Sequence, residues 1–432
     1  MNPVSEALRP PEGITALQQE RWRAQRSYVV SQSPFFARLW AGRPVPERLE
    51  DLSALPLCDK AMLRESQAAH PPFGDYLAAV REFVIRLHRT SGTTGQAMNI
   101  AQTEADAAQT AEVGARCFQA AGLTTGTLTV HCLNYRMWMG GVSDHLSLEA
   151  AGATVIPFGA GDSQLLVRTI LDLKVRVIHC TPSYPAALER TIAEHFPGLA
   201  PRDLGLTLGL FGGEAGLDDP SFRERLESVW GFTARNANYG VSDVFSNFAS
   251  QCWANNDLHF LGEDVLYPEL IEPESGEPVP WREGARGELV LTHLKREAQP
   301  LVRFRTNDVI AITGTGMCAC GREATRFRVL GRSDDMVVVR GVNIFPTAVG
   351  GVIGGFDALS GEFRIRLKGG GPYDRLPVEA ELAEGAETSG ALAARVEEAI
   401  KATLRASASV TLLPPGSLPR TGGKTQRLIR ED

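Results

Sequence analysis

Apolar and polar positions alternate with two different periods along this chain. Near the start, apolar side chains such as Trp22, Val29 and Phe36 recur at helical spacing, so residues 14–40 are predicted to form one or two helices. Residues 104–121 are alanine-rich and predict another helix. Short apolar runs then alternate with helical stretches. Strands are expected at residues 127–133, 153–158, 175–180 and 206–211, and helices at 162–173, 184–195 and 221–230.

This alternation predicts a parallel sheet with helices on both faces. The pattern changes near residue 258, after which residues 265–272 and 287–294 are predicted to be β-strands. We therefore expect an α/β protein: a large N-terminal domain (1–333) with parallel and mixed sheets, helices and a β-rich subdomain, then a small C-terminal α+β domain (334–432). In the small domain, strands at 363–368, 378–382 and 410–413 are expected to surround a helix at 390–405.

Composition narrows the class of protein. The chain has 432 residues, enough for two or three domains, and its 43% hydrophobic and 22% charged residues are typical of a globular protein. A net charge of −7 argues against nucleic-acid binding. No basic-then-apolar leader and no apolar run of ~20 residues is present, so we expect neither a signal peptide nor a membrane span. Seven scattered cysteines favour a reducing cytoplasm over a disulfide framework.

Two short segments suggest phosphate chemistry. The loop Thr90-Ser91-Gly92-Thr93-Thr94-Gly95 follows an apolar run, and its glycines, hydroxyls and N–H groups are suited to holding phosphates. Far downstream, Lys424 follows a glycine pair and is a candidate cation for the same site. The lysine of the standard P-loop is missing, which disfavours a P-loop kinase or ATPase. Taken alone, such a Ser/Thr/Gly hexapeptide is most often a surface turn.

Further motifs lie between these two segments in a fixed order. They occupy residues 72–74, 180–184, 238–243, 287–290, 303–308, 331–336 and 340–346. In order and spacing, the whole set resembles the adenylate-forming superfamily of acyl-CoA synthetases, and within it the phenylacetate–CoA ligase family of aryl-acid ligases. The resemblance runs nearly from end to end.

The resemblance implies a nucleotide site in the large domain. Thr90 to Gly95 would cradle the β- and γ-phosphates of ATP, and Tyr239 would stack on adenine through its apolar face. Asp308 would accept hydrogen bonds from the ribose hydroxyls, and Arg332 would reach the ribose or a phosphate. The remaining expected ATP-site residues are Gly213 and Glu214 at the adenine, with Asn238 and Gly240 beside Tyr239.

The resemblance also implies a moving small domain. Asp334 would be the hinge, and Lys424 would bridge the carboxylate and the α-phosphate, stabilising the developing charge. With Lys424, we expect Arg332 and Asp243 to be catalytic. Two positions depart from the family pattern: Asp243 replaces a glutamate that is a candidate Mg²⁺ ligand, and Asn307 replaces a glycine. Asp243 keeps the charge on a shorter side chain but could instead cap backbone donors, and Asn tolerates positive φ.

A cysteine–histidine set predicts a structural metal site. Cys318 and Cys320 form a close pair in a glycine-rich turn, and Cys252 and His259 lie upstream. Some family members carry zinc in this region, and four such ligands would leave no open position for chemistry. The Cys-x-Cys spacing is less typical than Cys-x-x-Cys, so four unrelated residues is the alternative.

An aromatic stretch after a predicted strand suggests the acid pocket. Asn134 and Asn238 could recognise a ring hydroxyl, amine or nitrogen. His131 is assigned no role, because a lone histidine is more often structural, and the aromatic residues could equally be core packing. By resemblance, the expected lining is Tyr135, Trp138, Gly141, Phe211, Gly212 and Ala237.

The resemblance therefore implies an ATP- and Mg²⁺-dependent ligase that activates an aromatic acid to acyl-AMP and transfers it to coenzyme A. One alternative is an adenylase that stops at acyl-AMP or loads a carrier-protein thiol. Another is a non-catalytic nucleotide-binding homologue in which Asp243 and Asn307 have impaired the metal and ribose sites. A homodimer is expected from the resemblance alone.

Overall fold

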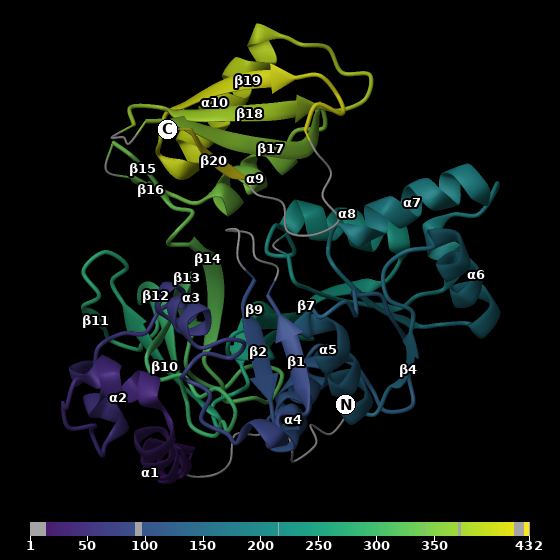
Figure 1. Ribbon diagram of the computed structural model, residues 1–432. Helices are drawn as coiled ribbons and strands as arrows, with labels where there is room; N and C mark the ends of the chain where they lie inside the picture. The colour runs from purple at the N-terminus through teal and green to yellow at the C-terminus, as the bar shows by residue number, and fades with distance from the viewer. Residues whose placement is uncertain are drawn as a thin grey trace.

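The computed structural model describes residues 14–90, 97–214, 216–340, 342–369, 373–418 and 427–431. A small C-terminal unit lies against one side of a larger body that contains the long sheet (Figure 1). None of the described helices is both long enough and apolar enough to cross a membrane.

One continuous sheet of 12 strands organises the larger body, in the order β11-β10-β12-β13-β14-β9-β8-β7-β6-β5-β3-β4. Its parallel half runs from β7 to β4. The parallel strands are β3 (Leu128–His131), β4 (Thr154–Pro157), β5 (Val177–Cys180), β6 (Leu208–Gly212) and β7 (Thr233–Val241). The antiparallel strands are β8 (Phe245–Cys252), β9 (Asn255–Phe260), β10 (Leu266–Ile271), β11 (Pro278–Val279), β12 (Arg286–His293), β13 (Phe304–Gly314) and β14 (Arg326–Arg332).

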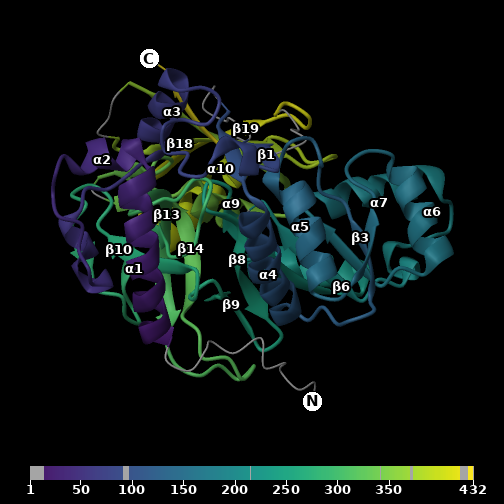
Figure 2. The same cartoon turned by 60° about the horizontal axis from the view of Figure 1, so that its bottom comes forward.

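Helices cover both faces of the parallel half because its strands are apolar on both sides. Neighbouring residues point to opposite faces: Val177 and Leu210 share one hydrophobic cluster, and Ile178 and Phe211 share another. α4 (Glu104–Ala120) and α5 (Met139–Ala150) cover the first face, and Figure 2 shows them lying across the sheet. The second face is covered by α6 (Ser163–Leu173), α7 (Tyr184–His195) and α8 (Pro220–Trp230).

The N-terminal helices pack against the antiparallel half of the sheet. Trp22 and Phe36 are fully buried in the same cluster as Phe248 and Phe327. A separate two-stranded sheet then brackets the phosphate-loop residues. These elements are α1 (Ile14–Gln32), α2 (Pro34–Trp40), α3 (Lys60–Ala69), β1 (Arg86–Arg89) and β2 (Asn99–Gln102), with short 3₁₀ helices η2 (Leu49–Ala54), η3 (Arg81–Phe83) and η4 (Pro201–Leu204).

The C-terminal unit has its own hydrophobic cluster, which draws only on residues from Val337 onward. Its four-stranded sheet has the order β19-β18-β17-β20, with two parallel pairs around one antiparallel pair. Its elements are β15 (Val337–Val339), β16 (Val342–Ile344), α9 (Pro346–Gly354), β17 (Leu359–Lys368), β18 (Leu376–Leu382), α10 (Gly390–Leu404), β19 (Ala408–Leu413) and β20 (Leu428–Glu431).

The expected α/β class and nearly all the expected elements are confirmed. The first four residues of the motif at residues 238–243 belong to β7. Helix α5 was not predicted, because its buried side includes Ser143, Asp144 and Ser147, which break the apolar periodicity.

The face covered by α4 provides a direct test of this packing. Phe118 is fully buried, and its ring meets the His179 ring edge-on at 5.0 Å. Phe118→Ala should lower the free energy of unfolding by about 3–5 kcal/mol through lost burial and a residual cavity. Glu112→Ala, at an exposed position on the same helix, should stay within about 0.5 kcal/mol of wild type. Urea denaturation measures both, and equal effects of the two changes would contradict this packing.

Candidate active site

β7 is the junction of the two halves of the sheet, since it pairs parallel with β6 and antiparallel with β8. Ligands of open α/β sheets bind at the carboxyl ends of parallel strands. At that end of β6 and β7, Gly212 pairs with Asn238. A Cβ on Gly212 would overlap Asn238, and one on Gly240 would overlap the Ser246 backbone. Glycine at these positions therefore lets neighbouring segments approach closely beside Tyr239.

Tyr239, on the junction strand, packs against the antiparallel half of the sheet. Its ring meets Phe248 and Phe327 edge-on, at 5.3 and 5.4 Å between centroids. Its hydroxyl donates to Asp308 Oδ2 at 2.8 Å, which links β7 to β13. Burial, together with the neighbouring Asp308 charge, raises the pKa of Tyr239 well above its ordinary value. The phenol therefore stays protonated and donates to the carboxylate.

Arg332 connects Asp308 to the start of the C-terminal unit. Its Nη1 lies 3.2 Å from Asp308 Oδ1, and its Nε and Nη2 donate to Asp334 at 2.8 and 2.7 Å. Burial alone would lower the pKa of Arg332, but the hydrogen bonds to Asp334 and the charge of Asp308 raise it. Asn307 adds a hydrogen bond to Asp334 at 3.3 Å and has φ of 61°, a left-handed conformation. The structure thus brings Tyr239, Asp308, Arg332 and Asp334 together.

Asp243 lies at the end of this junction and has a partner that the sequence did not reveal. Lys60 Nζ, at the start of α3, donates to Asp243 Oδ2 at 2.7 Å. Asp243 is 7% exposed, and its Oδ1 is buried without a hydrogen-bond partner among the described residues. The pair spans 183 residues of sequence, so no local pattern could have identified Lys60. The unpaired oxygen is an acceptor suited to a hard cation.

The predicted phosphate loop is described only at its base. Thr90 N donates to Met98 O at 3.0 Å, and Met98 N donates back to Thr90 Oγ1 at 3.0 Å. These bonds close the segment between β1 and β2. Ser91, Gly92, Thr93, Thr94 and Gly95 lie outside the described residues, as does Lys424.

The two residues expected at the adenine follow β6. Gly213 has φ of 81°, and a Cβ there would lie 3.2 Å from the Trp138 ring. Glu214 Oε2 accepts a hydrogen bond from Ser183 N at 3.3 Å. Both therefore lie at the carboxyl end of the sheet, near the region expected to bind the acid.

The residues expected to line the acid pocket divide into two groups. The Trp138 ring lies over Gly140 and Gly213, and Gly141 lies against the backbone of Asn134 and Tyr135. By contrast, Phe211 is fully buried on the opposite face of the sheet from Ala237, with its ring 5.7 Å from Phe232. Phe211 therefore packs in the core beneath helices α6 to α8, and does not share a slot with Ala237.

Buried histidines lie behind the Tyr135 loop. His131 and His179 share a hydrogen bond between their Nδ1 atoms at 2.8 Å, and His131 Nε2 donates to Gly141 O at 2.8 Å. Burial lowers the pKa of His131 to about 4 and that of His179 well below its ordinary value. Both rings are therefore neutral at pH 7 and position the Gly141 backbone. Tyr135 in turn bonds His145 Nδ1 at 2.9 Å.

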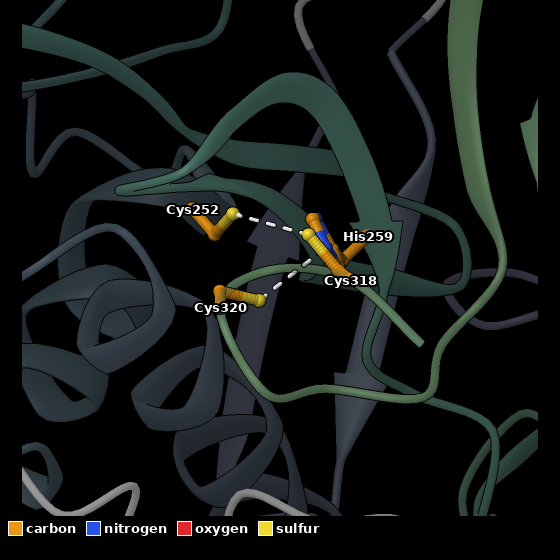
Figure 3. Close-up of side chains that lie close together, drawn as sticks. All are labelled: Cys252, His259, Cys318 and Cys320. Atoms are coloured by element: carbon orange, nitrogen blue, oxygen red, sulfur yellow. Dashed lines mark hydrogen bonds between the residues drawn. The ribbon is translucent and has the colours of Figure 1, made fainter. Parts of the chain in front are cut away.

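The predicted metal ligands converge in the structure. Cys252 lies in β8, His259 in β9, and Cys318 and Cys320 in the turn after β13, as Figure 3 shows. Their ligand atoms all lie within 4.8 Å of one another. The Cys252–Cys318 sulfurs are 3.9 Å apart, and Cys320 Sγ is 3.7 Å from His259 Nε2. Tetrahedral zinc with Zn–S bonds of about 2.3 Å requires ligand separations of about 3.8 Å, so these residues fit the ion.

Comparisons with known proteins identify the family of this chain. Residues 341–431 match the family model of the AMP-binding enzyme C-terminal domain. Over 453 aligned residues, the chain is 35% identical to a phenylacetate–coenzyme A ligase of Thermus thermophilus, covering 99% of this chain and 98% of the relative. It is 32% identical to a phenylacetate–coenzyme A ligase of Aromatoleum evansii, covering 99% and 96%.

A solved structure extends the likeness to three dimensions. A 2-hydroxyisobutyryl-CoA ligase in its postadenylation state, in complex with 2-HIB-AMP, superposes with a TM-score of 0.86 at 29% identity, covering 98% of this chain and 90% of the other. The fold is that of the adenylate-forming enzymes. Within that class, the chain belongs to the phenylacetate–coenzyme A ligase family.

The buried histidines make stability depend on pH. An unfolded histidine has a pKa of about 6.5, so below that pH the unfolded chain binds a proton that folded His131 does not. The free energy of unfolding should therefore decrease as pH falls from 6.5 towards 4. His131→Asn should make this decrease shallower by about 1.4 kcal/mol per pH unit.

Urea denaturation at several pH values between 7 and 4.5 measures these slopes. His195→Asn, at an exposed position on α7, is the matched control and should keep the wild-type slope. Equal slopes for the His131 variant and wild type would contradict the assignment of His131 as a buried neutral ring.

Proposed function

We propose that this protein is an ATP-dependent acid–thiol ligase that converts an aromatic carboxylic acid to acyl-AMP and then to its coenzyme A thioester. The observation that carries the proposal is the cluster of Tyr239, Asp308 and Arg332 at the junction strand, linked to Asp334 at the start of the C-terminal unit. The full-length likeness to phenylacetate–coenzyme A ligases supports the same reaction.

The cluster is suited to a nucleoside. The Asp308 carboxylate is fixed by Tyr239 and Arg332, so it can accept from a ribose diol without reorganising. Tyr239 would offer its ring to adenine, with Gly213, Glu214, Asn238 and Gly240 around it. Thr90 closes the base of the loop whose remaining residues would hold the β- and γ-phosphates.

Asp243 is the proposed magnesium ligand. Its buried Oδ1 is open, and Lys60 neutralises part of its charge through Oδ2. Mg²⁺ is commonly held by one or two carboxylates together with substrate phosphates. When bound, the ion would screen the charge of the triphosphate. Lys60 would keep the Asp243 carboxylate oriented for that role.

Lys424 is the proposed catalytic cation, and Asp334 the hinge residue that carries it to and from the site. The 2-hydroxyisobutyryl-CoA ligase supports such motion, because it has been solved in a postadenylation state, an open conformation and a thioesterification state. The chain superposes on its postadenylation state with a TM-score of 0.86, but on its thioesterification state, in complex with 2-HIB-AMP and CoA, with a TM-score of only 0.70. We propose that residues 334–432 rotate as a unit between the two half-reactions.

The acid pocket is proposed at the Trp138 loop. The Trp138 ring lies against Gly213 after β6, and Gly141 lies against the Tyr135 backbone. Gly212, at the carboxyl end of β6, pairs with Asn238, which follows Ala237 and precedes Tyr239 in β7. An aromatic acid could pack against the partly exposed Trp138 indole. The relatives, which are phenylacetate–coenzyme A ligases, point to the same kind of acid. A small hydroxy acid is the second candidate, because the 2-hydroxyisobutyryl-CoA ligase is so similar in structure.

Three further features of the molecule remain proposals. We place a structural zinc ion between Cys252, His259, Cys318 and Cys320, which their separations support. We place the enzyme in the cytoplasm, as its unpaired cysteines suggest. We also propose a homodimer, in which exposed apolar side chains such as Phe83 could be covered.

Product analysis tests the reaction. Incubation with ATP, Mg²⁺ and benzoic, phenylacetic, hydroxybenzoic, aminobenzoic and 2-hydroxyisobutyric acids should release pyrophosphate with at least one acid, and added coenzyme A should yield its thioester. Acyl-AMP that accumulates despite coenzyme A would favour the carrier-protein alternative. No pyrophosphate with any acid would favour a non-catalytic homologue.

In the same assay, Lys424→Ala should slow adenylate formation by about 10²–10³-fold, because one preorganised charge is lost. Pyrophosphate–ATP exchange measures this step separately from thioester formation. Lys401→Ala on α10, at an exposed position, is the control and should retain the wild-type rate. Wild-type exchange in the Lys424 variant would remove that residue from the mechanism.

Metal analysis tests the zinc site. Purified protein should contain one zinc ion per chain by mass spectrometry, and Cys320→Ala should lose most of it, with a thermal midpoint several degrees lower. Cys180→Ala alters a buried thiol in β5, which β6 and β7 separate from β8, and should retain the metal. Wild-type protein stripped of metal but with an unchanged thermal midpoint would argue against a structural ion.

A further inference from the structure

A buried carboxylate adjoins the proposed nucleotide cluster without belonging to it. Glu288, on β12, has no solvent exposure and forms a two-point ion pair with Arg305 of β13, at 2.9 Å to Nε and 2.6 Å to Nη2. Its Oε1 also accepts a hydrogen bond from Asn307 N at 3.3 Å, and its Oε2 accepts one from Ser333 Oγ at 3.0 Å. One carboxylate therefore joins β12, β13 and the residue that follows β14.

Two of these partners are neighbours of residues with proposed roles. Asn307 directly precedes Asp308, and Ser333 directly precedes Asp334. Ser333 N donates to Asn307 O at 2.7 Å, so the backbone pairing with β13 continues past the end of β14 as far as Ser333. The Ser333 hydroxyl lies closer to the Glu288 carboxylate than to Asn307 O, which is 3.3 Å away. Glu288 thus holds the residue before the proposed ribose ligand and the residue before the proposed hinge.

Stability alone does not account for this arrangement. Apolar residues of similar volume in place of a buried ion pair often leave stability unchanged or raise it. Arg305 already neutralises the carboxylate, yet two further donors converge on it. Asn307 has φ of 61°, a left-handed conformation that residues other than glycine adopt mainly where surrounding contacts hold them. The hydrogen bond from Asn307 N to Glu288 is one such contact.

We propose that Glu288 is a positioning residue for the ligase reaction, because its carboxylate fixes the backbone before Asp308 and the hydroxyl before Asp334 relative to each other. The inference rests on the proposed function and deepens it. The bond to Asn307, the nucleotide arm, sets the position of the ribose-binding carboxylate. The bond to Ser333, the hinge arm, fixes the point beyond which the C-terminal unit turns. The nucleotide site and the hinge therefore keep one geometry during both half-reactions.

Separate variants test the two arms. Ser333→Ala removes the hinge arm and leaves the bonds from Arg305 and Asn307 in place, whereas Glu288→Gln keeps the shape of the side chain and weakens both arms. Isothermal titration calorimetry measures the Kd for ATP, and thioester formation is measured with the acid that the wild-type enzyme uses best. Rates are divided by the number of active sites, counted from the burst of pyrophosphate in a single turnover, so that unfolded molecules do not lower them.

Glu288→Gln should raise the Kd for ATP by about 10-fold and also slow thioester formation, because a donor loses its acceptor and Asp308 is held less precisely. Ser333→Ala should leave the Kd for ATP within about 2-fold of wild type but slow thioester formation by about 10-fold. Ser333→Thr retains the hydroxyl and should restore the wild-type rate. Glu283→Gln, at an exposed position just before β12, is the matched control and should behave as wild type.

The two arms and the ligase function fail differently. An unchanged Kd for ATP in Glu288→Gln would overturn the nucleotide arm, and a wild-type rate in Ser333→Ala would overturn the hinge arm. Both results together would leave Glu288 as a stabilising partner of Arg305 alone. If the glutamine variant does not fold, the two Ser333 variants still decide the hinge arm. Wild-type enzyme that forms no thioester with any acid would overturn the ligase function instead, and the Kd for ATP would still decide the nucleotide arm.

Discussion

The rest of the structure depends on the pairing of β7, which runs parallel to β6 on one side and antiparallel to β8 on the other. Ligands of parallel sheets bind at the carboxyl ends of the strands. An antiparallel neighbour begins at the end where the preceding strand stops, so its first residues lie beside that site. Tyr239 therefore meets Asp308 of β13 through a 2.8 Å hydrogen bond across 69 residues of sequence. The glycines at 212 and 240 make that junction possible, because side chains there would overlap neighbouring residues.

The same junction connects the large body to the C-terminal unit. Arg332 donates both to Asp308, in the proposed nucleotide site, and to Asp334, the proposed hinge. One guanidinium therefore connects the two residues. Such pairs near the surface are individually weak, whereas the hydrophobic clusters on either side are extensive. The geometry thus places a readily broken polar contact between two stable cores, which suits the proposed rotation of residues 334–432.

Helix α5 shows why buried polar groups were the hardest part to predict. The pattern of Ser143, Asp144 and Ser147 contains no apolar stripe, yet all three are buried. Their partners come from distant segments, such as Asn238 for Asp144, so no local period could identify the helix or the carboxyl group. The same holds for Lys60 with Asp243. Phe211 illustrates the converse, since the family resemblance placed it in the acid pocket, whereas the alternation of β6 turns its ring into the core.

By itself, the sequence determined the alternation of strands and helices, the α/β class, the order of the motifs and, through them, the family. These follow from local periodicity and from the residue types that phosphate and metal chemistry require. Only the tertiary structure decided which side chains meet: Tyr239 with Asp308, Lys60 with Asp243, Asp144 with Asn238, and the four proposed zinc ligands with one another. Sheet order and strand register set those meetings, and both depend on packing between segments far apart in the chain.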